Sequence, residues 1–143
     1  MQPEISIVAA RLNSVSIHLV RRSRIADRSL GVPPGQLSAL SVLVFGGDRT
    51  IAQLAEAEQV TSPTMTRIVD GLERANLAER RQHPDDGRAI VVRASKRGRR
   101  VMERGRRQRV ELLSGLLERL DDDDVVAVAR ATEVLASALE AAE

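Results

Sequence analysis

The 143-residue sequence contains no cysteine and a single aromatic residue, Phe45. Without a thiol, disulfides, thiol-based redox sensing and cysteine-ligated metal sites are all excluded. With one aromatic ring, a row of aromatic side chains stacking on unpaired bases is excluded as a binding mode. The hydrophobic core must therefore be built from leucine, isoleucine, valine and alanine.

Long apolar runs are also missing. No run approaches the 18 residues expected of a membrane-spanning helix, and the amino terminus carries no signal-peptide pattern. We therefore expect a cytoplasmic location and no membrane partner. The length suits one domain with a proper core, and the 43% hydrophobic and 29% charged content is ordinary for a folded chain.

Catalytic and metal-binding patterns are absent as well. No nucleophile–base pair, metal-ligand spacing or glycine-rich phosphate loop occurs, so the sequence predicts neither an enzyme nor a cofactor. His83 stands close to Asp85 and Asp86, but neighbouring loop residues rarely form a closed metal site. The run Asp121–Asp124 reads as a helix start, because a cation site would need spaced ligands.

What the sequence has in excess is basic charge in its middle. Residues 61–110 hold 14 basic and 6 acidic side chains, a net charge of +8, whereas residues 111–143 carry a net charge of −7. Such a distribution predicts a polyanion-binding region carried by a more neutral or acidic scaffold.

Apolar residues recurring every three or four positions predict six helices. The first runs from Ile5 to about Ser29, and the consecutive prolines Pro33 and Pro34 separate it from the second. Thr50 and Gln53 form a capping box that opens the short third helix. Thr61 or Ser62 caps the fourth, with Pro63 in its first turn and Asn76 at its end. Two further helices follow, from Ser95 to about Leu120 and from Asp121–Asp124 onward.

A β-hairpin is predicted between the fourth and fifth helices. Its strands, Leu77–Gln82 and Arg88–Arg93, flank Pro84-Asp85-Asp86-Gly87, where Asp-Gly favours a tight hairpin turn. Two short helices joined by a tight turn and followed by a hairpin make a winged helix-turn-helix. The expected fold is therefore mainly α with a small β-hairpin wing, one domain over 1–143, with the DNA-binding region in 35–95.

In this fold the fourth helix suits the major groove of duplex DNA, where short polar side chains at its amino end reach base edges and phosphates. Its candidate contacts are Ser62, Thr64, Thr66 and Arg67, and Arg67 is the best candidate for a bidentate guanine contact. Arg88 at the hairpin tip is a candidate for the minor groove or a phosphate. Taken singly, each of these residues would be read as a cap or a solvated helix residue.

These segments together resemble the MarR (multiple antibiotic resistance regulator) family. The resemblance rests on Val60–Glu73, on Leu77–Arg80, on the wing Pro84–Arg88 and on Ser95–Gly98. Within the wing, the Asp-x-Arg pair of Asp86 and Arg88 is the family's most recognisable feature, and we expect Asp86 to orient the wing, for example by pairing with an arginine. Asn76 stands in place of the usual glycine, and Ala94-Ser95 in place of Leu-Thr.

The resemblance implies a homodimer in which the terminal helices, 1–30 and 96–143, intertwine. The apolar faces of the terminal segments, more than a small DNA-binding core can cover, predict a dimer independently. The family also implies a small-ligand pocket between the dimerisation and DNA-binding regions. If an effector exists, we place it near His18, Val42 and Met102.

The leading hypothesis is a sequence-specific DNA-binding transcriptional regulator, a repressor that acts as a homodimer on a palindromic operator and is released by a small ligand. The alternative is a dimeric interaction module that keeps the winged-helix fold but does not read DNA. The charge of +8 in the central segment and the intact Arg88 wing argue against it.

Overall fold

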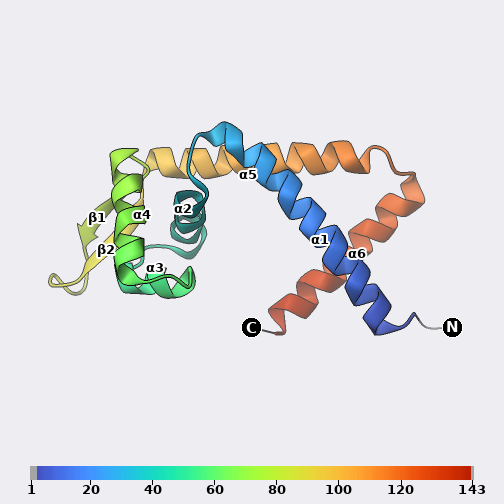
Figure 1. Cartoon of the computed structure of the whole chain (residues 1–143), viewed down its shortest axis with the longest axis horizontal. Helices are drawn as coiled ribbons and strands as arrows, with labels where there is room; N and C mark the ends of the chain where they lie inside the picture. The colour runs from blue at the N-terminus through green and yellow to red at the C-terminus, as the bar shows by residue number, and fades with distance from the viewer. Residues whose placement is uncertain (1–2, 143) are drawn as a thin grey trace. The chain divides into compact units, whose positions relative to one another are not determined.

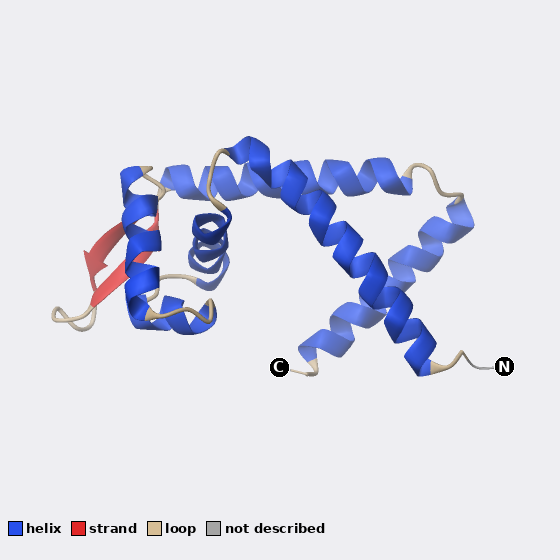
Figure 2. Cartoon of the chain, viewed as in Figure 1, coloured by secondary structure: helices blue, strands red, loops and turns tan. Residues whose placement is uncertain are grey.

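The computed structural model describes residues 3–142 and divides the chain into two compact units, residues 1–108 and 109–143. Its elements are α1 (Ile5–Asp27), η1 (Arg28–Leu30), α2 (Pro34–Gly46), α3 (Ile51–Ala57), α4 (Ser62–Arg74), β1 (Ala78–Gln82), β2 (Ile90–Ala94), α5 (Lys96–Leu117) and α6 (Asp122–Glu140) (Figures 1 and 2). The prediction of a mainly helical fold with one small hairpin is confirmed.

Local capping groups fix the starts of α3 and α4. The Thr50 hydroxyl accepts a hydrogen bond from the Gln53 amide at 3.2 Å, and the Gln53 side chain accepts one from the Thr50 amide at 2.9 Å. Thr61 caps α4 by accepting from the Thr64 amide at 3.3 Å. Asn76, beyond the end of α4, has a φ of 57°, the left-handed conformation expected there.

The core of residues 1–108 lies between α2, α3, α4 and the hairpin. Its fully buried side chains are all aliphatic or methionine: Leu40, Leu43, Leu54, Met65, Val69, Leu72 and Val92. Three of them, Met65, Val69 and Leu72, form the buried face of α4, while Ile68 on the same helix is only half-buried. Packing between these elements fixes the orientation of α4, because burial of one face forces the opposite face into solvent.

The hairpin differs from its prediction at the turn. Gln82 pairs with Ile90, so that seven residues, 83–89, form the loop instead of a tight two-residue turn. Gly87 does not take the positive φ that such a turn requires. Instead, the His83 amide donates to the Ala89 carbonyl at 2.8 Å, and the ladder ends there, because the Ala89 amide donates to the Asp86 carbonyl within the loop at 3.1 Å.

β2 is bonded to the loop between α2 and α3, a contact that the sequence does not predict. The Arg49 amide donates to the Val92 carbonyl at 3.2 Å, and the Val92 amide donates to the Arg49 carbonyl at 2.7 Å. This bridge makes Arg49 a one-residue third strand and secures the base of the hairpin.

Ser95 joins the hairpin to α5. Its hydroxyl accepts from the Gly98 amide at 3.0 Å, which caps the helix, and donates to the Asn76 carbonyl at 2.7 Å. The start of α5 is thereby held beside the C-terminal end of α4 (Figure 1). The helix ends at Leu117, three residues before the predicted end, and Asp121 caps α6 as expected.

The two terminal helices α1 and α6 have no buried residue in the single chain. Large apolar side chains are exposed along both, for example Val15 at 54% and Val134 at 61%. No single helix within residues 3–142 is long and apolar enough to cross a bilayer. Ile5–Leu30 and Pro34–Gly46 reach the required length and hydropathy only when they are taken together, and the chain bends by 93° between them. Buried core helices can pass the same test.

Candidate nucleic-acid interface

The N-terminal turns of α4 present a short polar surface. Ser62, Thr64 and Arg67 are exposed, whereas Thr66 is half-buried and its hydroxyl donates to the Ser62 carbonyl at 3.0 Å. The Thr64 hydroxyl accepts from the Thr61 hydroxyl at 2.9 Å, which leaves its own proton free to donate. The structure therefore brings all four predicted residues to one end of one helix, with Thr66 the least accessible of them.

Arg67 on α4 and Arg88 on the wing both carry a free cationic group. Both side chains are exposed, and within residues 3–142 neither guanidinium group has a hydrogen-bond or ion-pair partner. A guanidinium group carries five N–H donors in a planar fork that matches a guanine edge or a phosphate. These two groups can therefore bind an external acceptor without first breaking an internal ion pair.

Asp86 contacts the wing backbone. Its Oδ1 accepts a hydrogen bond from the Arg88 amide at 3.1 Å, and its carbonyl accepts one from the Ala89 amide at 3.1 Å. Among the ion pairs of the described residues, none joins Asp86 to an arginine side chain. Asp86 thus bonds the backbone on which Arg88 sits and leaves the Arg88 side chain unengaged.

Arg80 connects the wing to α4. From β1 its guanidinium group pairs with Asp70 at 2.9 Å and with Glu73, both on α4, and its backbone amide donates to Glu73 Oε1 at 2.9 Å. The hydrogen bond with Asp70 raises the pKa of Arg80 above its ordinary value. Desolvation of the half-buried side chain lowers this pKa, and the negative charge of Glu73 raises it further. Sequence reasoning missed this clamp, although Asp70 and Glu73 stand three residues apart on one helix face.

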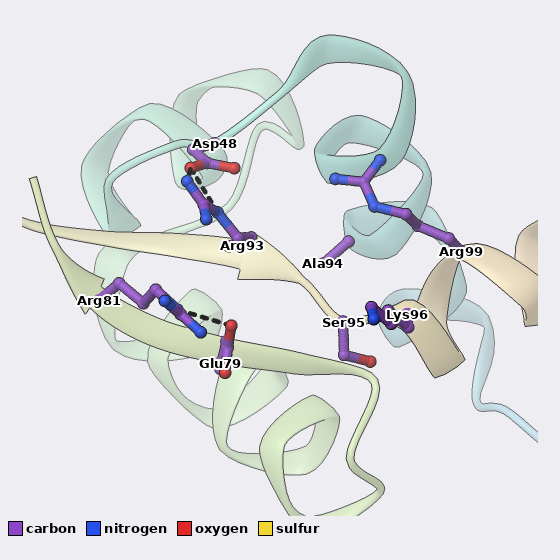
Figure 3. Close-up of a pocket in the computed structure, with 8 residues that line it drawn as sticks. All are labelled: Asp48, Glu79, Arg81, Arg93, Ala94, Ser95, Lys96 and Arg99. Carbon is purple, nitrogen blue, oxygen red and sulfur yellow. Dashed lines mark hydrogen bonds and ion pairs between the residues drawn. The ribbon is translucent and has the colours of Figure 1, made fainter. Parts of the chain in front are cut away.

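A second charged cluster lies at the base of the hairpin, around an open pocket of about 550 Å³ (Figure 3). Arg93 pairs there with Asp48 at 2.8 Å and Arg81 with Glu79 at 2.6 Å. The hydrogen bond to Asp48 raises the pKa of Arg93. Lys96 and Arg99, at the start of α5, line the same pocket without a carboxylate partner in the described chain.

The three residues predicted near an effector have different environments. Met102 belongs to the buried core at 3% exposure, Val42 packs against that core, and His18 is exposed on α1. None of the three lines the pocket of Figure 3. His83, the other imidazole, accepts a hydrogen bond from the Asp85 amide at 3.1 Å, and residues 3–142 contain no group of three or more potential metal ligands.

Comparison with known proteins gives a consistent set of similarities. A sequence profile described as the MarR family matches residues 30–89. An uncharacterized HTH-type transcriptional regulator of Mycobacterium leprae is 34% identical over 116 residues, which cover 81% of this chain and 81% of that protein.

Solved structures show the same fold. A transcriptional regulator from Thermotoga maritima superposes with a TM-score of 0.84 at 21% identity, covering 94% of this chain and 95% of that one. A mutant of MepR from S. aureus, solved bound to an oligodeoxyribonucleotide, gives a TM-score of 0.72 at 21% identity, covering 91% and 96%. Both superpositions show that this chain shares the fold of these proteins.

Proposed function

The chain belongs to the MarR family of HTH-type transcriptional regulators, and from this premise we propose that it binds a specific DNA operator through α4 and the wing. The observation that carries the proposal is the pair of free guanidinium groups, Arg67 and Arg88, on two elements that Arg80 ties together. A regulator of this kind acts on the chromosome, which places it in the cytoplasm.

The N-terminal end of α4 reads the major groove. Ser62 and Thr64 supply short donors and acceptors close to the helix end, where backbone N–H groups also favour phosphates. Arg67 lies about one and a half turns further along the exposed face and reaches base edges, where a guanidinium group can bond guanine O6 and N7 together. Thr66 contributes mainly by its backbone bond within the helix.

The wing supplies the second contact. Arg88 extends from a seven-residue loop that is long enough to leave the sheet and enter the adjacent minor groove. Asp86 supports this role by bonding the Arg88 amide, which restricts the loop without neutralising the guanidinium charge. We assign Asp86 as the wing-orienting residue on this basis.

A second copy of the chain covers the terminal helices. Apolar side chains are exposed along α1 and α6, and a folded chain rarely leaves so many of them in water. A two-fold dimer presents two α4 helices, so that its operator is a palindrome with half-sites about one helical turn, roughly 34–36 Å, or a multiple of it, apart.

Repression follows from occupancy of the promoter, since a dimer seated on the duplex blocks access to it. A small ligand that favours another spacing of the two α4 helices would release the operator. We place that ligand near His18, Val42 and Met102. If substitution of all three residues left the ligand affinity unchanged, the ligand would not bind at this position.

A binding titration tests the operator proposal. Fluorescence anisotropy with a labelled fragment of the protein's own promoter should give a Kd of about 10⁻⁸–10⁻¹¹ M at physiological salt, at least about 10³-fold tighter than for a scrambled fragment. Equal affinity for both fragments would instead support the interaction module that keeps the fold without reading DNA. Addition of the protein to transcription from that promoter should lower the yield, and an increase would contradict repression.

A further inference from the structure

The first three turns of α5 carry a dense group of cations. Seven basic side chains on residues 96–107 are exposed, and in residues 3–142 six of them have no ion-pair or hydrogen-bond partner. Glu103 is the only acidic residue in this stretch, and its nearest arginine, Arg106, stands 3.9 Å away. We call the six the basic surface: Lys96, Arg97, Arg99, Arg100, Arg104 and Arg107.

Helix geometry spreads these cations around the solvent side of α5. The buried positions Gly98, Met102 and Gly105 take the side that faces the core. Like charges three or four residues apart destabilise a helix, and Glu103 is the only carboxylate among residues 96–107 that can offset them. By contrast, Arg80, Arg81 and Arg93 nearby each have a carboxylate partner. The basic surface is therefore suited to an external polyanion.

The basic surface lies away from the operator contacts. Ser95, just before α5, bonds the Asn76 carbonyl, which follows the C-terminal end of α4 (Figure 1). The polar turn at Ser62 and Thr64 stands at the opposite end of this helix, whose 13 residues span about 20 Å at 1.5 Å per residue, and Arg67 lies near the middle. A straight duplex that receives the N-terminal turn of α4 lies beyond that end and leaves the basic surface free.

We propose that the basic surface binds the phosphate backbone of a second DNA duplex, so that the protein holds two duplex segments at once. Duplex DNA carries one charge per about 1.7 Å of its axis, a density that suits six cations on about 17 Å of helix. No groove-reading element accompanies these arginines, so this binding is independent of sequence and weakens steeply with salt. Binding of a second duplex is an activity beyond operator recognition, and the proposal does not depend on operator recognition.

The acidic segment 111–143 of another copy is the competing occupant, with a net charge of −7. Part of that charge already has a local role, because Asp121 caps α6 and the following aspartates stabilise the positive end of its dipole. DNA is the better match, since chromosomal duplex surrounds an operator-bound protein at high effective concentration.

The test compares two variants with the same loss of charge. One carries Arg97→Gln, Arg100→Gln, Arg104→Gln and Arg107→Gln on the basic surface. The matched control carries Arg11→Gln, Arg21→Gln, Arg22→Gln and Arg24→Gln, all exposed on α1. Each protein is saturated with a short duplex from its promoter and titrated with a fluorescent unrelated 30-base-pair duplex at several salt concentrations, and sedimentation confirms fold and oligomeric state.

The wild type and the control should bind the second duplex, whereas the surface variant should bind it at least ten-fold more weakly. Its slope of log K against log salt should fall by about three to four, at roughly 0.9 per phosphate contact. Affinity for the promoter duplex should stay within two-fold. The same titration is repeated with an unrelated duplex in place of the promoter duplex. Binding of two duplexes is then measured without an operator, so that a failure of operator recognition can be distinguished from a failure of this proposal.

Four results would overturn the proposal. The wild type could fail to take up a second duplex, or the surface variant could retain it. An equal loss of promoter affinity in the surface variant would place these arginines in the operator interface instead. Assemblies that form without DNA and disappear in the surface variant would identify the acidic segment of another copy as the partner.

Discussion

Arg67 and Arg88 carry the same charge, but Arg67 lies on the helix α4 and Arg88 on the loop of the wing. Their removal should therefore have different consequences. Arg67→Ala should cost about 1–3 kcal/mol per half-site and relax the preference at one base position, because a bidentate base contact is lost. Arg88→Ala should weaken binding to every sequence and lower the salt slope by roughly 0.9 per phosphate contact. Anisotropy titrations against an operator series with single-base changes measure both effects.

Circular dichroism first has to show that both variants are folded. If Arg67→Ala leaves affinity and specificity unchanged, α4 is not the reading helix. If neither substitution has an effect, the interaction module becomes the better account of this chain.

Two glycines of α5 offer a comparison of packing at single residues. A Cβ on Gly98 would stand 2.2 Å from the Leu77 carbonyl oxygen and 3.0 Å from Leu40 Cδ1, whereas a Cβ on Gly115 meets nothing within 4 Å. Gly98→Ala should therefore lower the free energy of unfolding by about 1–3 kcal/mol, because backbone must move. Gly115→Ala should raise it by about 0.5–1 kcal/mol through helix propensity.

Chemical denaturation of both alanine variants measures the difference. A Gly98→Ala protein as stable as the wild type would show that α5 does not approach the Leu77 backbone so closely in solution.

At the level of elements, the Arg80 clamp sets how α4 and the wing are placed against each other. Arg80→Met keeps the length of the side chain but leaves Asp70 and Glu73 without their cation. The free energy that holds the hairpin to α4 should fall by about 1 kcal/mol, and hydrogen exchange of the β1 and β2 amides should accelerate about five-fold. Operator affinity should fall with it, since the two DNA contacts lose their fixed spacing.

Arg81→Met is the matched control. Arg81 pairs with Glu79 on the same strand and joins no two elements, so its loss should leave hydrogen exchange in the hairpin unchanged. Equal effects of the two substitutions would mean that strand charge, and not the clamp, is responsible.

For the whole molecule, the terminal helices predict an obligatory dimer. Val8 and Val15 lie seven residues apart on one face of α1, at 47% and 54% exposure. Val8→Glu with Val15→Glu should give a monomer by sedimentation at micromolar concentration. Operator affinity should fall by about 10²–10⁴, because each half-site is then bound alone.

Ser14→Glu on the same helix adds charge outside this apolar row and should remain dimeric. A wild-type monomer at micromolar concentration with its helices intact would contradict the dimer itself.

The sequence by itself determined the features whose causes are local in the chain. Each of these features depends on residues within a few positions of one another: the Thr50–Gln53 capping box, a cap for α4 at Thr61 or Ser62, the break at the two prolines and the left-handed Asn76. The period of apolar residues likewise identified the helices and the exposed face of α4. The fold class and the candidate contacts followed from these, because their order along the chain is that of a winged helix.

The tertiary structure alone decided what depends on residues distant in the sequence. The pairing of Arg80 with α4, the Arg49–Val92 bridge and the approach of Gly98 to Leu77 all join elements that only the packed core brings together. The seven-residue wing loop belongs here too, since the ladder that ends at His83 and Ala89 overrode the local Asp-Gly preference for a tight turn. Local preferences amount to about 1 kcal/mol per residue, so the cooperative packing of many residues decides wherever the two disagree.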